Sequence, residues 1–347
     1  MPAVPSSFSP SPPRKILLVT KLIWGTSNAR LIGKAIFNIC LLVISTCKDV
    51  CTVLPCIVKR GANLRYLNFW LLLHATNRPL KQLFHTVSED NRVQPVLSIK
   101  LSDKSAGFSV TNKQGNLLYQ LSYCSVNEWT DEEMDNFFSS YPELEEDYYQ
   151  VLISYAFRKQ ILVPAGSYRK NDGGLLMSSL LGISGGSSVV SEAIPEWQLY
   201  NVYAVPDTVH DRLRRQFPKA TFRHQQSLEL RNTNAGVQHG SIQVDFATED
   251  FSVLVVSQSK LLFSGSFEYV TPADVLYQLL RVCRYLSLSQ QDVQLQLSGL
   301  IDSNSALYKE LYLYFIHIEF REATWSAINE YPAHFFTSLN DLAQCAL

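Results

Sequence analysis

The chain has 347 residues, of which 46% are hydrophobic and 12% aromatic, a composition that excludes a disordered protein and fits one large or two modest folded domains. The formal net charge of −1 conceals an asymmetry, because residues 1–94 hold 12 Lys and Arg against 3 Asp and Glu and the remainder is acidic. An acidic balance over the larger part argues against a nucleic-acid surface there, so no nucleic-acid partner is expected.

The first part of the chain differs in composition from the rest. Residues 1–13 are rich in Pro and Ser, as disordered segments are, and the uncharged run at 35–46 is shorter than the ~20 residues of a membrane-spanning helix. Residues 1–87 are therefore interpreted as a basic, cysteine-rich extension, disordered or non-native. Our hypothesis is that translation starts further downstream. The alternative is a genuine peripheral membrane extension, the one case in which a membrane partner is expected.

Cysteine usage indicates the compartment. The four early cysteines lack the paired CxxC spacing of a zinc site, and the three late ones stand in apolar or terminal settings typical of free thiols, at Cys124, Cys283 and Cys345. A cytoplasmic location is predicted.

The first folded segment follows residue 88. Alternating apolar and polar residues predict three strands, at Val96–Leu101, Gly107–Thr111 and Asn116–Tyr123. Thr130 and Glu133 form a capping box that opens a short helix with inward-facing Met134, Phe137 and Phe138. An apolar strand at Tyr148–Tyr155 completes the order βββαβ.

A less regular region connects this segment to the next. Gln160–Pro164 is predicted to be extended, and the Gly- and Ser-rich stretch Arg169–Ser191 to be mobile. A strand is predicted at Trp197–Val205, a helix at Pro206–Phe217 and a short helix or connection at His224–Arg231.

The last segment contains the best-formed elements. Three strands are predicted at Ile242–Phe246, Ser252–Val256 and Lys260–Phe267. A helix at Pro272–Leu286 begins with a Thr271 cap, Pro272 in the first position and Asp274 at the positive end of the dipole. A strand, a helix and a final strand follow, at Val293–Ser298, Ser305–Tyr314 and Ile316–Phe320.

The two folded segments share one order of elements. The second reads βββαβαβ and contains the βββαβ order of the first, which is a topological repeat. The sequence therefore predicts an α/β fold of two lobes with mixed sheets, with an extension at 1–87, a first lobe at 88–235 and a second lobe at 236–347.

Catalytic motifs are weak. Gly182–Gly186 matches the G-x-S-x-G pattern of a hydrolase, but its Ser-rich flanks favour a flexible glycine loop over a nucleophile elbow. The loop also lacks the Lys-Ser/Thr ending of a P-loop. The histidines are dispersed without ligand spacing. No catalytic residue and no metal ligand is assigned.

The repeated βββαβ lobe resembles the actin, hexokinase and heat-shock ATPase superfamily, whose two lobes flank a nucleotide cleft. That resemblance places phosphate loops between the first two strands of each lobe, commonly as D-x-G followed by Ser or Thr. In the second lobe Asp245 and Thr248 match this pattern, with Ala247 in place of Gly. In the first lobe Lys100 stands in place of the Asp, followed by Ser102. The adenosine-side Gly-Gly turn corresponds to Ser298-Gly299.

More closely, the chain is similar to domain-of-unknown-function family 3822 (DUF3822), which occurs in Bacteroidetes bacteria. The similarity covers residues 88–347 and is carried by Ser266–Tyr269, Asp274–Leu280, Leu297–Ile301 and Ser305–Phe320. It implies the actin-like two-lobed fold. The family has no established activity, so the resemblance supplies no catalytic residues.

The functional expectation is a non-catalytic cytoplasmic binding or scaffold protein with a degenerate nucleotide site and a protein partner. Asp245, Thr248, Ser298, Gly299 and Ser102 are the candidate residues of that site. The alternative is an ATPase or phosphotransferase that binds ATP and Mg²⁺ with Asp245 and Thr248. Lys100 discriminates between them: an ammonium in the cleft away from Asp245, with no other carboxylate nearby, makes magnesium-dependent catalysis hard to sustain.

Overall fold

The computed structural model describes residues 80–88, 92–233, 240–325 and 331–345. The described residues all belong to one unit, Pro79–Leu347. The hypotheses on the start of translation and on the four early cysteines concern residues outside the described ones.

The first lobe is built on a six-stranded sheet in the order β1-β4-β3-β2-β5-β9. Its strands are β1 (Lys81–Val87), β2 (Val96–Ser102), β3 (Ser105–Thr111), β4 (Leu118–Ser125), β5 (Gln150–Ala156) and β9 (Thr221–His224). β2, β3 and β4 are antiparallel, and β5 runs parallel to β2. Because β1 pairs with β4, the sheet begins at Lys81, ahead of the boundary at residue 88 that composition indicated.

The second lobe confirms the predicted order. Its five-stranded sheet has the order β12-β11-β10-β13-β14. The elements are β10 (Ser241–Phe246), β11 (Asp250–Ser257), β12 (Lys260–Glu268), α9 (Pro272–Leu286), β13 (Gln294–Gly299), α10 (Ala306–Tyr312) and β14 (His317–Phe320). β10 to β12 are antiparallel, and β13 and β14 run parallel to β10. This is the arrangement of the first lobe repeated.

A small third sheet, in the order β6-β8-β7, is inserted in the first lobe. Its elements are β6 (Gln160–Pro164), α6 (Gly173–Leu181), β7 (Ser187–Ile194), β8 (Leu199–Pro206) and α7 (Asp207–Gln216), with 3-10 turns at Ala165–Ser167 and Pro195–Trp197. The prediction of a mobile stretch at Arg169–Ser191 is therefore wrong. Met177 and Ile183 pack on Val202 of β8, so tertiary burial orders a segment of low intrinsic preference.

The G-x-S-x-G loop lies between α6 and β7. A nucleophile elbow needs a strand before the Ser and a helix after it. The order here is the reverse, with a helix before Ser184 and a strand after it, which agrees with the interpretation as a glycine loop.

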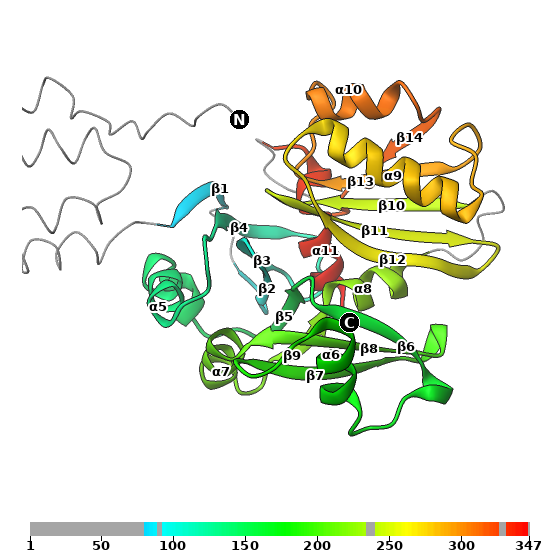
Figure 1. Ribbon diagram of the computed structural model, residues 1–347. Helices are drawn as coiled ribbons and strands as arrows, with labels where there is room; N and C mark the ends of the chain where they lie inside the picture. Colours follow the sequence, from blue (N-terminus) through cyan, green and yellow to red (C-terminus); the bar gives the residue numbers. More distant parts are fainter. Residues whose placement is uncertain (1–79, 89–91, 234–239, 326–330, 346–347) are drawn as a thin grey trace, which may run out of the picture. The chain divides into compact units, whose positions relative to one another are not determined.

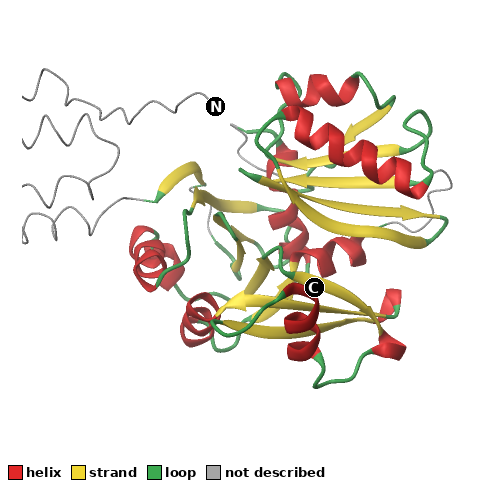
Figure 2. Ribbon diagram, viewed as in Figure 1, coloured by secondary structure: helices red, strands yellow, loops and turns green. Residues whose placement is uncertain are grey.

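The two large sheets lie in a layered arrangement (Figures 1 and 2). One face of the first sheet packs against α5 (Asp131–Ser140) and α7, and the second sheet packs against α9 and α10. Between the sheets lie α8 (Gln225–Asn232) and α11 (Thr337–Gln344), the latter preceded by the turn η6 (Ala333–Phe336). A further 3-10 turn at Pro142–Glu145 follows α5.

Helix α11 was not predicted, and the first sheet explains why. The strand face beneath α8 and α11 carries small polar side chains that are all buried, among them Ser98, Ser109, Thr111 and Ser154. In the sequence this alternation is typical of a sheet with one solvated face. Here small side chains let two helices approach the sheet closely. The C-terminal helix α11 thus packs on the first lobe, although it follows the second lobe in the sequence.

The helix starts are those that the sequence predicts, with one difference. At α9, Thr271 and Asp274 form a reciprocal capping box, and the Asp274 carboxylate also accepts from the N–H of Val270. At α5, the Thr130 hydroxyl accepts from the N–H of Glu133, and the described contacts include no return bond. Within the described ranges, no helix is long and apolar enough to cross a bilayer.

Candidate functional site

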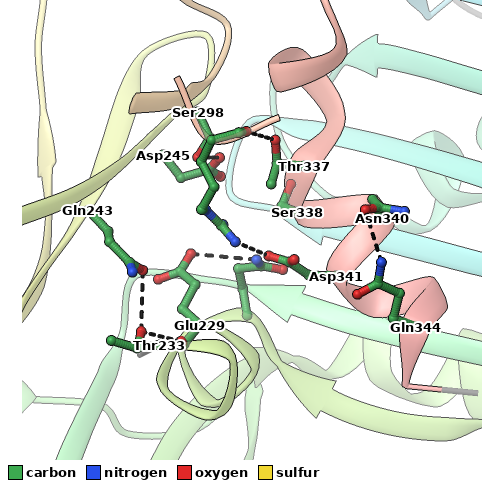
Figure 3. A network of polar contacts seen from close by, with 12 residues as sticks. Glu229, Thr233, Gln243, Asp245, Ser298, Thr337, Ser338, Asn340, Asp341 and Gln344 are labelled. Carbon is green, nitrogen blue, oxygen red and sulfur yellow. Dashed lines mark hydrogen bonds and ion pairs between the residues drawn. The ribbon is translucent and has the colours of Figure 1, made fainter. Parts of the chain in front are cut away.

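Lys100 and Asp245 meet between the lobes. Lys100 lies near the end of β2 and Asp245 near the end of β10, and the Lys100 Nζ donates to Asp245 Oδ2 over 3.0 Å. The same ammonium donates to Ser338 Oγ of α11 over 2.7 Å, and Ser298 Oγ of β13 donates to Asp245 Oδ1 over 2.8 Å. Figure 3 shows Asp245 and Ser298 facing Ser338 of α11. The contact joins both lobes and the C-terminal helix.

The sheet register places the two charged residues in matching positions. Lys100 stands opposite Ser154 of the parallel strand β5, and Asp245 stands opposite Ser298 of the parallel strand β13. The resemblance to the actin superfamily placed Lys100 and Asp245 at equivalent positions of the two lobes, and in the register of the two sheets they occupy equivalent positions.

Both members of the pair are charged. Burial disfavours the ammonium of Lys100, but the Asp245 carboxylate offsets this, and the pKa of Lys100 is raised above its ordinary value. Burial alone would raise the pKa of Asp245, but Lys100 and the Ser298 hydroxyl together hold it below its ordinary value. The side chains are 11% and 9% exposed, so the ion pair is largely desolvated.

The Lys100 ammonium does not occupy the position that would make magnesium-dependent catalysis hard to sustain, which is one away from Asp245 with no other carboxylate nearby. It does not lie away from Asp245; it binds Asp245 directly, and a second carboxylate, that of Glu229, lies in the same buried cluster. The lysine thus neutralises the carboxylate on which the alternative function depends.

Glu229 is the buried acid that sequence reasoning missed. It lies on α8 with only 4% of its surface exposed, and its Oε1 accepts from Ser252 Oγ over 3.4 Å. Burial, together with repulsion from Asp245, raises the pKa of Glu229 to about 7. On a short helix of mixed composition, nothing in the sequence distinguished it from a solvated glutamate.

Helix α11 closes the network from its other side. Arg321, just after β14, pairs with Asp341 of α11 over 2.7 Å, and its carbonyl accepts from the Thr337 hydroxyl. Asn340 Nδ2 donates to the Gly115 carbonyl of the first lobe over 3.3 Å. One helix therefore holds a second-lobe residue and a first-lobe turn at the same time. Figure 3 shows Thr337, Asn340 and Asp341 on this helix.

Arg158 makes a second charged contact between the lobes. It follows β5, and its Nε lies 3.3 Å from Asp103 Oδ2 of the first lobe and 3.6 Å from Asp250 Oδ2 of the second. Its guanidinium also pairs with Glu268 at the end of β12. Burial raises the pKa of Asp250 to about 6, although Arg158 opposes the shift.

Little space remains around these groups. A cavity of about 10 Å³ is lined by Lys100, Asp245 and Gly299 together with aromatic residues of η6. A second, of about 40 Å³, is lined by Ser102, Asp245 and Glu229 among others. The smaller has room for about one water molecule, whereas ligand pockets measure ~300–1,000 Å³.

The candidate residues from the sequence are therefore brought together only in part. Asp245 and Ser298 bond to each other, Gly299 lines the smaller cavity and Ser102 the larger. Thr248 lies in the β10–β11 turn and lines neither cavity.

Gly299 has a packing role. Its φ is +80°, and a Cβ there would lie 2.1 Å from the Phe246 carbonyl oxygen. A glycine is therefore required for the close approach of β13 to the end of β10.

The residues present do not fit a nucleotide with magnesium in this arrangement. Both oxygens of Asp245 already accept from protein donors, and the cavities are far smaller than a nucleotide. Among the described residues, no group of three His, Cys, Asp or Glu side chains could hold a metal ion.

Solved structures with similar folds include a protein from Bacteroides thetaiotaomicron VPI-5482 with an actin-like ATPase fold and unknown function. It is 20% identical, with a TM-score of 0.59 over 66% of this chain and 91% of that chain. The ethanolamine utilization protein EutJ from Carboxydothermus hydrogenoformans is 11% identical, with a TM-score of 0.39 over 74% and 92%. A PilM–PilN type IV pilus biogenesis complex is 10% identical, with a TM-score of 0.47 over 74% and 99%.

The first of these likenesses shows the fold, which is the actin-like one predicted from the repeated lobes. No curated protein matches the sequence. The model of one family of proteins of unknown function, DUF3822, matches residues 85–318, which is more than half of the chain. The chain therefore belongs to the DUF3822 family.

Proposed function

We propose that this chain is a non-catalytic, cytoplasmic binding or scaffold protein whose interlobe cleft is closed by its own side chains. The observation that carries the proposal is the position of the Lys100 ammonium, between Asp245 and Ser338. In a lobe pair of this fold, a second carboxylate at Lys100 would repel Asp245 and favour a cation between them. The lysine supplies that positive charge from within the chain.

Helix α11 adds to the argument. Its residues from Thr337 to Ala343 are all buried, and they contact β2 of the first lobe and β13 of the second. Opening the cleft wide enough for a nucleotide would separate Lys100 from Asp245 or displace this helix. Either change exposes buried charge or apolar surface, and each is costly. The two lobes therefore act as one rigid body that presents its outer surfaces.

The cytoplasmic part of the proposal is supported by the cysteines. Cys124 and Cys283 are buried and Cys345 is exposed, and all three are free thiols. Burial raises the pKa of the Cys124 thiol to about 12 and that of Cys283 to about 11, so neither is a reactive thiolate. Free thiols are typical of a reducing compartment.

A thermal-shift titration with Mg-ATP tests the proposal. We expect no change in the melting temperature at millimolar ATP, for the wild type and for Lys100→Met. Under the alternative, an ATPase or phosphotransferase using Asp245 and Thr248, ligand binding would stabilise the fold by RT ln(1 + [L]/Kd), about 2.7 kcal/mol at a hundredfold excess over Kd. A saturable shift in the wild type that Asp245→Asn removes would overturn the non-catalytic proposal.

A further inference from the structure

Helix α9 carries exposed tyrosines and arginines along one side, in a lobe whose overall charge is acidic. They are Tyr277, Arg281, Arg284 and Tyr285, which we call the α9 stripe. At 3.6 residues per turn these four positions fall within about 100° of arc on one side of the helix. The opposite side, with Val275, Leu279 and Val282, is buried against the sheet. The stripe therefore faces outward.

The aromatic members of the α9 stripe gain nothing from the core. Tyr277 is 61% exposed and Tyr285 86% exposed. A serine or lysine at these positions would leave less apolar surface exposed to water than a tyrosine does, and its helix propensity is at least as high. Core packing therefore does not account for two exposed tyrosines on the side of α9 that faces away from the core.

The arginines of the α9 stripe form no ion pair with any residue that the structure describes. Elsewhere in the described ranges, six arginines each pair with a carboxylate: Arg92, Arg158, Arg212, Arg223, Arg231 and Arg321. Carboxylates are plentiful in this lobe, where residues 241–347 hold 12 Asp and Glu against 5 Lys and Arg. The guanidinium groups of Arg281 and Arg284 are therefore free to bind a carboxylate from outside.

Helix α10 extends the same surface. It packs beside α9 on the same face of the sheet (Figure 1) and exposes Lys309, with Tyr312 64% and Leu313 75% exposed. Asp274, in the first turn of α9, falls within the arc of the α9 stripe, and its carboxylate accepts from Thr271 in the capping box. The exposed charges of the two helices are thus Arg281, Arg284 and Lys309 against Asp274, with Glu310 half-buried, so the balance of this surface is basic.

We propose that the α9 stripe, with the exposed end of α10, is a docking surface for an acidic segment of a partner protein. Tyr and Arg are the residues that carry most binding energy at protein interfaces, and the arginine fork binds carboxylates in a bidentate way. A nucleic acid is disfavoured because the lobe as a whole is acidic and would repel a phosphate backbone. The proposal deepens the proposed function by giving its partner a chemistry.

The test uses fluorescence anisotropy with a short labelled helical peptide of Glu and Leu, and with the matched peptide that has Lys in place of Glu. The wild type should bind the Glu peptide, and raised salt should weaken the binding. Arg281→Glu/Arg284→Glu should raise Kd at least about tenfold, equivalent to ~1.4 kcal/mol. Tyr277→Ala/Tyr285→Ala should weaken binding at unchanged net charge.

The control is Arg169→Glu/Lys170→Glu, which reverses two exposed charges before α6 and changes the net charge equally. It should bind as the wild type does. Equal loss in both reversed variants, equal binding of the Lys peptide, or no binding by the wild type overturns the proposal. So does a wild-type dimer in sedimentation that Arg281→Glu/Arg284→Glu dissociates, because the occupant is then a second copy. The peptide assay contains no nucleotide. A negative result would therefore contradict only the docking surface, and the closed cleft is tested separately by the Mg-ATP titration.

Discussion

In the first lobe, β2 carries Lys100 opposite Ser154 of β5; in the second lobe, β10 carries Asp245 opposite Ser298 of β13. The backbone arrangement is the same, but the charges are opposite and the two side chains bind each other. Two equal carboxylates would have needed a cation between them. Here the equivalent positions of the two lobes carry opposite charges, and the ion pair between them closes the cleft.

One position further along, the lobes differ again. Tyr155 follows Ser154 in the first lobe and is fully buried, with its hydroxyl 3.0 Å from His210 Nδ1. Gly299 follows Ser298 in the second, where a side chain would collide with Phe246. The first lobe uses this position to fill its core against α7, whereas the second uses it to bring two strands together.

Breaking the charged pair should have the largest effect. Lys100→Ala leaves Asp245 buried without its counter-ion, and we expect a loss of about 3–5 kcal/mol in the free energy of unfolding. Urea denaturation measures it. Lys100→Met/Asp245→Asn removes both charges and should regain most of the loss. Lys219→Ala, at an exposed lysine of the first lobe, should change stability by less than about 0.5 kcal/mol.

The glycine difference can be tested in the same way. Gly299→Ala should cost roughly 3–4 kcal/mol, because the residue has positive φ and its Cβ would overlap the Phe246 backbone. Gly182→Ala is the matched control, since Gly182 also has positive φ but open space around it, and should cost about 1 kcal/mol. Equal losses in the two variants would contradict the close approach of β13 to β10.

Glu229, between the two sheets, predicts a pH dependence. Its pKa in the folded protein, about 7, exceeds the ordinary value of 4.5, so the folded state binds a proton more tightly than the unfolded state. The stability contribution is therefore fully present below about pH 4.5 and is lost as the pH rises through about 7. Glu229→Gln should remove this slope and stabilise the protein at pH 8, by about 1–3 kcal/mol, in denaturation curves recorded across the range. No difference between the two proteins at pH 8 would mean that Glu229 is ionised without penalty.

The two hydroxyls beside the pair should give the smallest effect. Ser338→Ala removes an acceptor from Lys100 and Ser298→Ala a donor to Asp245. Each should cost about 1–2 kcal/mol in urea denaturation. Because both serines bond to the same ion pair, the double variant should deviate from the sum of the single ones. Strict additivity would indicate that the two hydroxyls act on separate groups.

The sequence determined the regular elements of the second lobe, because each had a local cause. Alternation fixed β10 and β13, and Thr271, Pro272 and Asp274 fixed the start of α9. The order of elements was enough to indicate the actin-like fold, and the phosphate-loop pattern of that resemblance then placed Lys100 and Asp245 at equivalent positions of the two lobes. These features depend on residues near in sequence, which a pattern can reveal.

Only the tertiary structure decided how the cleft is closed. Helix α11 packs on the first lobe because the side chains on that face of the sheet are small and let the helix approach closely. An alternating strand pattern is the same whether the polar face contacts water or a helix, so the sequence alone could not predict this packing. Glu229 is buried because Asp245 and Ser252 approach it from another lobe. Contacts between residues more than a hundred positions apart produce no periodic pattern in the local sequence. Whether a charged side chain is buried depends on the segments that pack over it.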